Sequence, residues 1–184
     1  MLYNEIKGKT NYGQAIGILM LNTVLQRVPG DIGNATTFPF PVAYRIVKEA
    51  SPKRVAMDAD PALVEAFVKA GLELERESGV RAITTSCGFL ALFQRQLSAA
   101  VRVPVYTSAL LQLPMIAAAL PPGKRVGILT ADSANLTPRH LAAAGASYCP
   151  VTVMGMEHTT EFSSFLREDR TSFDAEKCRQ EHIE

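Results

Sequence analysis

The sequence VRAITTSCGFL at residues 80–90 holds the sharpest boundary between a strand and a helix in this chain. Its first half is apolar and β-branched, which is typical of a buried strand. The segment Phe89–Leu97 then carries apolar side chains at helical spacing. Cys87 therefore lies where a parallel strand ends and a helix begins. In an open α/β sheet this edge is where ligands bind.

The position of Cys87 predicts a reactive thiol. The first turn of the following helix offers free N–H groups and the positive end of the helix dipole, and both favour the thiolate. Gly88 has no Cβ, so an anionic group can approach the backbone. The alternative is that Cys87 only packs, as most free cysteines do. The hydroxyl residues before Cys87 and the glycine after it favour a catalytic role over simple packing.

The composition excludes several classes of protein. The chain has 184 residues, of which 47% are hydrophobic and 20% charged, so it can bury a core. A net charge of +1 without a basic stripe argues against nucleic acid. Three cysteines without zinc spacing indicate a reducing cytoplasm and no metal. The polar N-terminus does not resemble a secretory signal, and the longest apolar run, Ala109–Leu120, is too short to cross a membrane.

Strand and helix patterns alternate along the chain. Strands are expected at residues 15–21, 42–50, 80–85, 103–108, 124–130 and 147–156, and helices at 60–78, 89–97, 109–120, 135–144 and 174–184. Between the first two strands, residues 28–41 form a long segment rich in Gly and Pro, and such a loop is more often functional than not. The alternation predicts an α/β fold with a parallel sheet flanked by helices.

Two lobes are expected. Gly17-Ile18-Leu19 and Gly127-Ile128-Leu129 occupy similar positions in similar units, which hints at an internal duplication. The first lobe would cover residues 1–102, with Cys87, and the second residues 103–184. The second lobe is expected to be incomplete, because its last helix is followed by no strand. The alternative is that this helix closes the fold.

Polar side chains follow the strands at the edge where Cys87 lies. Besides Cys87, the candidate site residues are those that would bind the substrate: Asn22, Thr85, Ser86, Gly88, Thr130 and Asp132. Hydroxyls, amides and free N–H groups suit a small carboxylate. Dinucleotide and phosphate-loop glycine motifs are missing, so no cofactor is expected. The alternative for Thr85 and Ser86 is that they cap the next helix.

His158 is the histidine nearest the expected site. A Cys87–His158 pair would make a cysteine hydrolase, although a lone histidine at a strand end is more often structural. His140 and His182 lie on predicted helices and are expected to be solvated. Cys149 and Cys178 are expected to be structural, with Cys149 at the opposite edge of the sheet.

The segment Thr84–Leu90, the two Gly-Ile-Leu strands and Asn22 resemble the aspartate/glutamate racemase superfamily, which includes hydantoin racemases, maleate isomerases and arylmalonate decarboxylases. The resemblance runs from about residue 14 to the end of the chain. It implies flavodoxin-like lobes with the site between them, and catalysis without pyridoxal phosphate by two cysteines on opposite faces of the substrate. Cys87 matches the first cysteine, Asn22 the polar residue near the substrate amino group, and Thr85, Ser86 and Gly88 the carboxylate site.

The second cysteine of the superfamily has no counterpart here, so the chain resembles a C-terminally shortened member. The leading hypothesis is a cofactor-independent racemase or isomerase of a small amino or carboxylic acid, with a homodimer as a candidate assembly. A decarboxylase or cis-trans isomerase relative, a carboxylate-binding protein without turnover, and the Cys87–His158 hydrolase are the alternatives.

Overall fold

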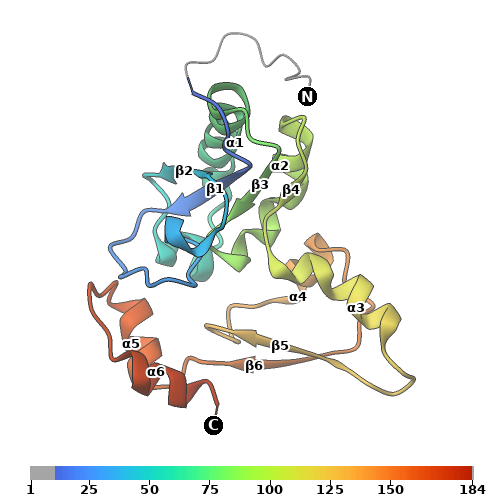
Figure 1. Cartoon of the computed structure of the whole chain (residues 1–184). Helices are drawn as coiled ribbons and strands as arrows, with labels where there is room; N and C mark the ends of the chain where they lie inside the picture. The colour runs from blue at the N-terminus through green and yellow to red at the C-terminus, as the bar shows by residue number, and fades with distance from the viewer. Residues whose placement is uncertain (1–10, 184) are drawn as a thin grey trace.

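The computed structural model describes residues 11–183, which form two parallel sheets surrounded by helices (Figure 1). The first sheet has the order β2-β1-β3-β4, and the second pairs β5 with β6. The strands are β1 Ile16–Leu21, β2 Val42–Val47, β3 Ala82–Thr85, β4 Val105–Tyr106, β5 Val126–Thr130 and β6 Val151–Gly155. The predicted α/β class with parallel strands is confirmed.

The centre of the first sheet is β1, which pairs with β2 on one side and β3 on the other. Ile18 and Leu19 in β1 are fully buried, as expected for a strand covered on both faces. The chain leaves β1 toward β2 and leaves β3 toward β4, so the strand order reverses between β1 and β3. Ligands of open α/β folds bind beyond the carboxyl ends of the strands at such a point.

The helix that covers β1 begins and ends where the sequence indicates. The Asp60 side chain accepts a hydrogen bond from the Ala62 N–H, with Pro61 in the first turn. The helical segment continues through α1, Val64–Glu73, and a π-helical turn to Ser78. Gly79 then ends it in the left-handed conformation at φ 67°. Phe67 in α1 is fully buried among residues of the first core.

The other helical segments are mostly short. The α-helices are α2 Gln94–Ala100, α3 Leu113–Ala119, α4 Pro138–Ala143, α5 Glu161–Arg167 and α6 Ala175–Glu181. The 3-10 segments are η1 Ala35–Thr37, η3 Pro61–Leu63, η5 Gly88–Phe93 and η6 Ala109–Gln112, and the π-helical ones are η2 Lys53–Met57 and η4 Leu74–Ser78. The segment η5 carries the chain from β3 into α2.

The second sheet has a smaller core, whose buried residues are Ala91, Leu110, Leu113, Val126, Ala144, Ala146 and Cys149. Its two strands leave large apolar side chains exposed, with Leu129 at 54% and Met154 at 67%. Helices α5 and α6 lie near the loop that follows β1 (Figure 1). The two regions are joined there, because the Val24 N–H donates to Asp169 Oδ1 at 2.9 Å.

Three details differ from the sequence-based expectations. Strand β4 follows residue 102 but pairs with β3, so the first sheet extends beyond the predicted boundary between the lobes. Helix α5 was not expected from the sequence. His140 is 1% exposed rather than solvated, because α4 packs against η5 with this side chain between them. Within residues 11–183, no helix is long and apolar enough to cross a membrane.

Candidate active site

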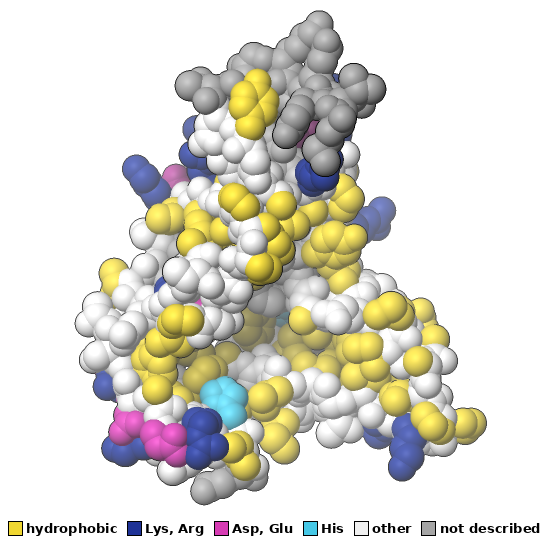
Figure 2. Space-filling model, viewed as in Figure 1, with side chains coloured by type: hydrophobic (Ala, Val, Ile, Leu, Met, Phe, Trp, Pro, Cys, Tyr) yellow, Lys and Arg dark blue, Asp and Glu magenta, His cyan; other side chains and the backbone are white. Residues whose placement is uncertain are grey.

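A cavity of about 720 Å³ lies between the two sheets. Figure 2 shows the hollow between the two parts of the molecule, with hydrophobic side chains around it. One wall comes from the ends of β1 and β3, and the other from β5 and the segments after β5 and β6. The cavity lies at the predicted edge of the first sheet. Of the candidate residues, it brings together Ser86, Cys87, Gly88, Thr130 and Asp132.

Cys87 lies at the junction between β3 and η5, as the sequence indicates. It is in extended conformation at φ −141° and ψ 117°, and η5 begins at the next residue. The Cys87 N–H donates to Thr85 Oγ1 at 3.4 Å, and that hydroxyl donates to the Thr107 carbonyl at 2.7 Å. Thr85 thus ties the Cys87 backbone to the segment after β4. The thiol is partly buried and lines the cavity.

The effect on the thiol pKa that the sequence predicts for the start of the following helix is outweighed by burial. Burial raises the pKa of its thiol from 9.0 to about 11. The N–H groups of Phe89 and Leu90 and the charge of Arg27 lower this pKa, but they do not offset the loss of water. The η5 amides therefore act on the sulfur as expected, and desolvation is the larger effect.

Small polar groups surround Cys87 on the first wall. Ser86 Oγ accepts the Leu21 N–H at 3.2 Å, and its own proton remains available to a ligand. Ser108 Oγ accepts the Leu110 N–H at 3.2 Å. A Cβ at Gly88 would lie 3.3 Å from Ser108 Oγ, so the glycine keeps the approach to the backbone open. The sequence did not single out Ser108, which follows the short strand β4.

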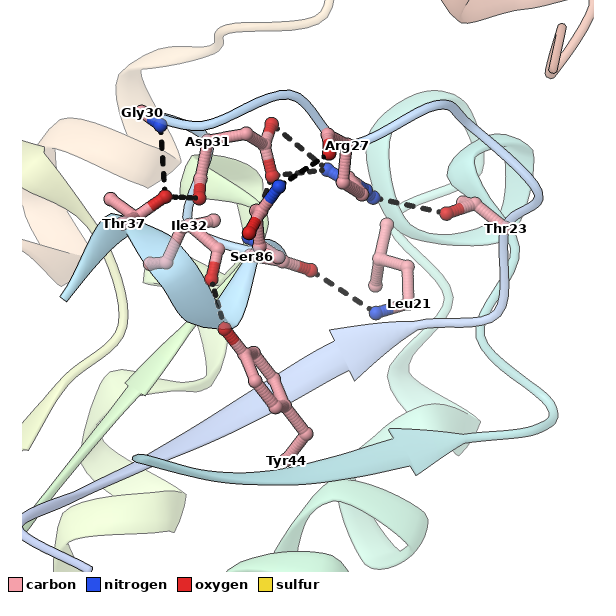
Figure 3. Close-up of polar contacts among 11 residues, drawn as sticks. Leu21, Thr23, Arg27, Gly30, Asp31, Ile32, Thr37, Tyr44 and Ser86 are labelled. Atoms are coloured by element: carbon pink, nitrogen blue, oxygen red, sulfur yellow. Dashed lines mark hydrogen bonds and ion pairs between the residues drawn. The ribbon is translucent and has the colours of Figure 1, made fainter. Parts of the chain in front are cut away.

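The long loop after β1 contributes a cation that sequence reasoning missed. Arg27 lines the cavity and donates from Nη1 to both Asp31 oxygens, at 3.2 and 3.3 Å, and from Nη2 to Thr23 Oγ1 at 3.0 Å. Figure 3 shows this cluster beside the contact between Ser86 and Leu21. The unusual length of this loop was the one feature of the sequence that suggested a functional role. The direction of the Arg27 side chain depends on these tertiary contacts, which the sequence does not show.

The second wall is acidic. Asp132 accepts from the Asn135 N–H at 3.1 Å and from Asn135 Nδ2 at 2.8 Å. Glu157 accepts from the Ser133 N–H at 3.0 Å and from the Ser133 hydroxyl, and these hydrogen bonds lower its pKa from 4.5 to about 2. Both carboxylates line the cavity. Glu157 is ionised at any physiological pH.

Two candidate residues have other roles in the structure. Asn22 donates from Nδ2 to the Lys48 carbonyl at 3.0 Å and is outside the cavity lining. Thr85 is buried and positions the Cys87 backbone instead of lining the cavity. In both residues the side chain donates its hydrogen bond to a backbone carbonyl and not to the cavity. The sequence predicted that Asn22 and Thr85 lie at the carboxyl edge of the sheet, but it could not predict where their side chains point.

The Cys87–His158 pair is not formed. His158 is 91% exposed, lies 3.8 Å from Glu157, and is not part of the cavity lining. Within residues 11–183, Cys87 is the one cysteine that lines the cavity, since Cys149 and Cys178 are buried elsewhere. The same residues contain no group of His, Cys, Asp or Glu arranged to hold a metal ion.

Comparison with solved structures finds the same fold in an enzyme. A glycine-to-cysteine mutant of arylmalonate decarboxylase, in its sulfate-associated form, aligns with a TM-score of 0.54 and 20% identity, over 83% of this chain and 66% of the other. The chain therefore shares the fold of this decarboxylase. An aspartate racemase homologue from Pyrococcus horikoshii OT3 aligns with a TM-score of 0.47 and 18% identity, over 84% of this chain and 70% of the other.

Sequence comparison finds relatives that are named for another activity. The chain is 32% identical over 127 residues to a dimethylsulfoniopropionate lyase from Durusdinium sp. clade D, covering 68% of this chain and 42% of that protein. It is 27% identical over 167 residues to dimethylsulfoniopropionate lyase 6 from Emiliania huxleyi (strain CCMP1516), covering 88% and 43%. The chain thus spans less than half the length of these lyases. No protein-family model matches it.

Proposed function

We propose that this chain provides the thiol base of a lyase that acts on dimethylsulfoniopropionate. The observation that carries the proposal is a cavity with one cysteine, Cys87, among small hydrogen-bonding groups that suit a carboxylate. The sequence relatives are lyases named for this substrate, a propionate with a dimethylsulfonium group on the carbon beyond Cα. The chain matches less than half of each relative, so the activity of these whole proteins is not carried over to it. The proposal depends on the residues of the cavity.

The proposed reaction needs one base and no added oxidant or reductant. The Cys87 thiolate takes a proton from Cα, and the electron pair of that C–H bond forms the double bond between Cα and Cβ. The bond between Cβ and sulfur breaks, and its electrons leave with dimethyl sulfide. The products are dimethyl sulfide, acrylate and the neutral thiol, which returns its proton to water.

The raised pKa of Cys87 suits such a step. The hydrogen next to a carboxylate is a weak acid, and a thiolate whose conjugate acid has a pKa of about 11 is a stronger base than an ordinary one. A sulfonium cation near the sulfur would also favour the thiolate, because opposite charges stabilise each other at short range. Bound substrate would thus help to form the base that it requires.

Racemisation of an amino acid, the activity first expected from the sequence, stays a prediction. It requires a second acid on the opposite face of the substrate. Within residues 11–183, neither Cys149 nor Cys178 lines the cavity. Elimination from one face therefore has the better support, while both reactions begin with the same proton transfer at Cα.

The test measures dimethyl sulfide and acrylate from dimethylsulfoniopropionate, with Cys87→Ser and the buried Cys149→Ser as a matched pair. Loss of both products in Cys87→Ser, with retention in Cys149→Ser, supports the proposal. Equal activity of the two variants contradicts it.

A parallel incubation of aspartate or glutamate in heavy water tests the alternative. Deuterium at Cα without any dimethyl sulfide from the sulfonium compound identifies a racemase or isomerase. Protection of Cys87 from alkylation by a carboxylate, with neither exchange nor elimination, identifies a binding protein.

A further inference from the structure

We propose that Arg27 binds the carboxylate of the substrate beside Cys87. The inference deepens the proposed function, because it names the group that would orient a small carboxylate toward the thiol. Arg27 and Cys87 line the same cavity, although they are far apart in the sequence. An arginine head group presents several N–H donors in one plane, which matches the geometry of a carboxylate.

The Arg27 head group is held in place before any ligand binds. Asp31 and Thr23 each accept hydrogen bonds from one of its terminal nitrogens, as Figure 3 shows. Asp31 is fixed in turn by the Gly33 N–H at 2.6 Å, and Asn34 Nδ2 donates to the Arg27 carbonyl at 2.7 Å. A cation that is already oriented loses less conformational freedom when it binds an anion.

These contacts leave donors free on the guanidinium. Arginine has five N–H donors, and the bonds to Asp31 and Thr23 involve only Nη1 and Nη2. The side chain keeps 21% of its surface exposed, on a residue that lines the cavity. A carboxylate can therefore bind the guanidinium without displacing Asp31.

The electric field at the sulfur agrees with this placement. The positive charge of Arg27 lowers the pKa of the Cys87 thiol, so the guanidinium acts on the sulfur across the cavity. The same charge would offset the repulsion between a bound carboxylate and the thiolate, which otherwise disfavours the reactive form.

Among residues 11–183, two further cations line the cavity, and both are less suitable. Lys53 donates to both Asp58 oxygens, at 2.9 and 2.8 Å, and its side chain is 72% exposed. Arg167 donates to the Glu157 carbonyl at 2.6 Å and also to the Ser163 hydroxyl. These contacts hold it at the acidic wall. Arg27 remains as the cation whose charge reaches the thiol.

The experiment compares the alkylation of Cys87 by iodoacetate and by iodoacetamide. The two reagents differ in charge and react with the same thiolate, so the ratio of their rates cancels any change in the thiol pKa. Rates are measured on the native 184-residue chain near pH 9, by mass spectrometry of the peptide that contains Cys87. The readout does not require lyase activity.

The variants are chosen to move this ratio in opposite directions. Arg27→Gln should lower the iodoacetate-to-iodoacetamide ratio by about tenfold, the change expected when one charge interaction near a protein surface is lost. Arg27→Lys keeps the charge and should lower it less. Asp31→Asn removes the competing carboxylate and should raise it. Arg45→Gln is the matched control, because Arg45 pairs with Glu77 at 2.7 Å outside the cavity.

The outcomes separate this inference from the proposed function. An unchanged ratio in Arg27→Gln, or a ratio that falls in both Arg27→Gln and Asp31→Asn, overturns the role of Arg27, even if dimethyl sulfide is formed. Failure of both reagents to label Cys87 in the native chain overturns it as well. Opposite shifts in the two variants support it, even if the chain releases no dimethyl sulfide and only the lyase proposal fails.

Discussion

Raising the pH should increase the reactivity of Cys87 well beyond the range in which ordinary cysteines titrate. Burial moves the thiol pKa from 9.0 to about 11. At about pH 8 only one molecule in roughly a thousand then carries the thiolate. Between about pH 8 and pH 10, the rate of alkylation by a neutral reagent should rise about tenfold per pH unit, with no plateau near neutrality.

The same shift predicts a loss of stability in alkali. Between pH 9.0 and about 11 the folded state keeps the Cys87 proton, whereas the unfolded state releases it. The unfolded state thus binds fewer protons, so the free energy of unfolding falls as the pH rises. The stabilisation is fully present below pH 9.0 and lost as the pH passes about 11. Two pKa units correspond to about 3 kcal/mol in all.

Two measurements check this prediction. Alkylation of Cys87 by neutral iodoacetamide is followed from about pH 7 to pH 12, and urea unfolding is compared between the natural chain and Cys87→Ala at about pH 8 and pH 10. The difference in stability should shrink by about 1 kcal/mol over that interval, because the other titrating groups cancel in the comparison. A midpoint at or below pH 9 would refute the reasoning, since the η5 amides would then outweigh burial.

Two substitutions test other parts of the structure, each against a matched control. In Gly155→Ala the new Cβ would lie 1.8 Å from Glu157 Oε2, so the carboxylate must move. Its pKa should then rise from about 2 toward 4.5, which carbon-13 NMR titration can measure. Gly127→Ala meets no atom within 4 Å and should leave the Glu157 pKa unchanged, so equal shifts would contradict the explanation. Phe67→Ala removes a fully buried ring and should lower the free energy of unfolding by about 3–5 kcal/mol in urea titration. Met115→Ala, at a side chain that is 69% exposed, should change it by less than about 0.5 kcal/mol, and similar losses in both would exclude Phe67 from the core.

The acidic wall shows how far the sequence could predict the site. The sequence placed Thr130 and Asp132 at the end of a strand, and in the structure both line the cavity opposite Cys87. It could not show that Ser133 holds Glu157, because that hydrogen bond joins residues 24 positions apart. It also placed His158 near the site, where the solvated side chain contributes nothing to the cavity lining.

Local pattern alone determined the strands, their parallel direction and the position of Cys87 between β3 and η5. Those features depend on the spacing of apolar residues, on Asp60 and Gly79, which begin and end a helix, and on the change from apolar to small polar residues after Thr85. Tertiary structure decided that β4 joins the first sheet, that Arg27 reaches the cavity, and that the thiol keeps its proton. The physical reason is that solvent exclusion and charge interactions act through space, between segments whose distance in the sequence gives no measure of their separation.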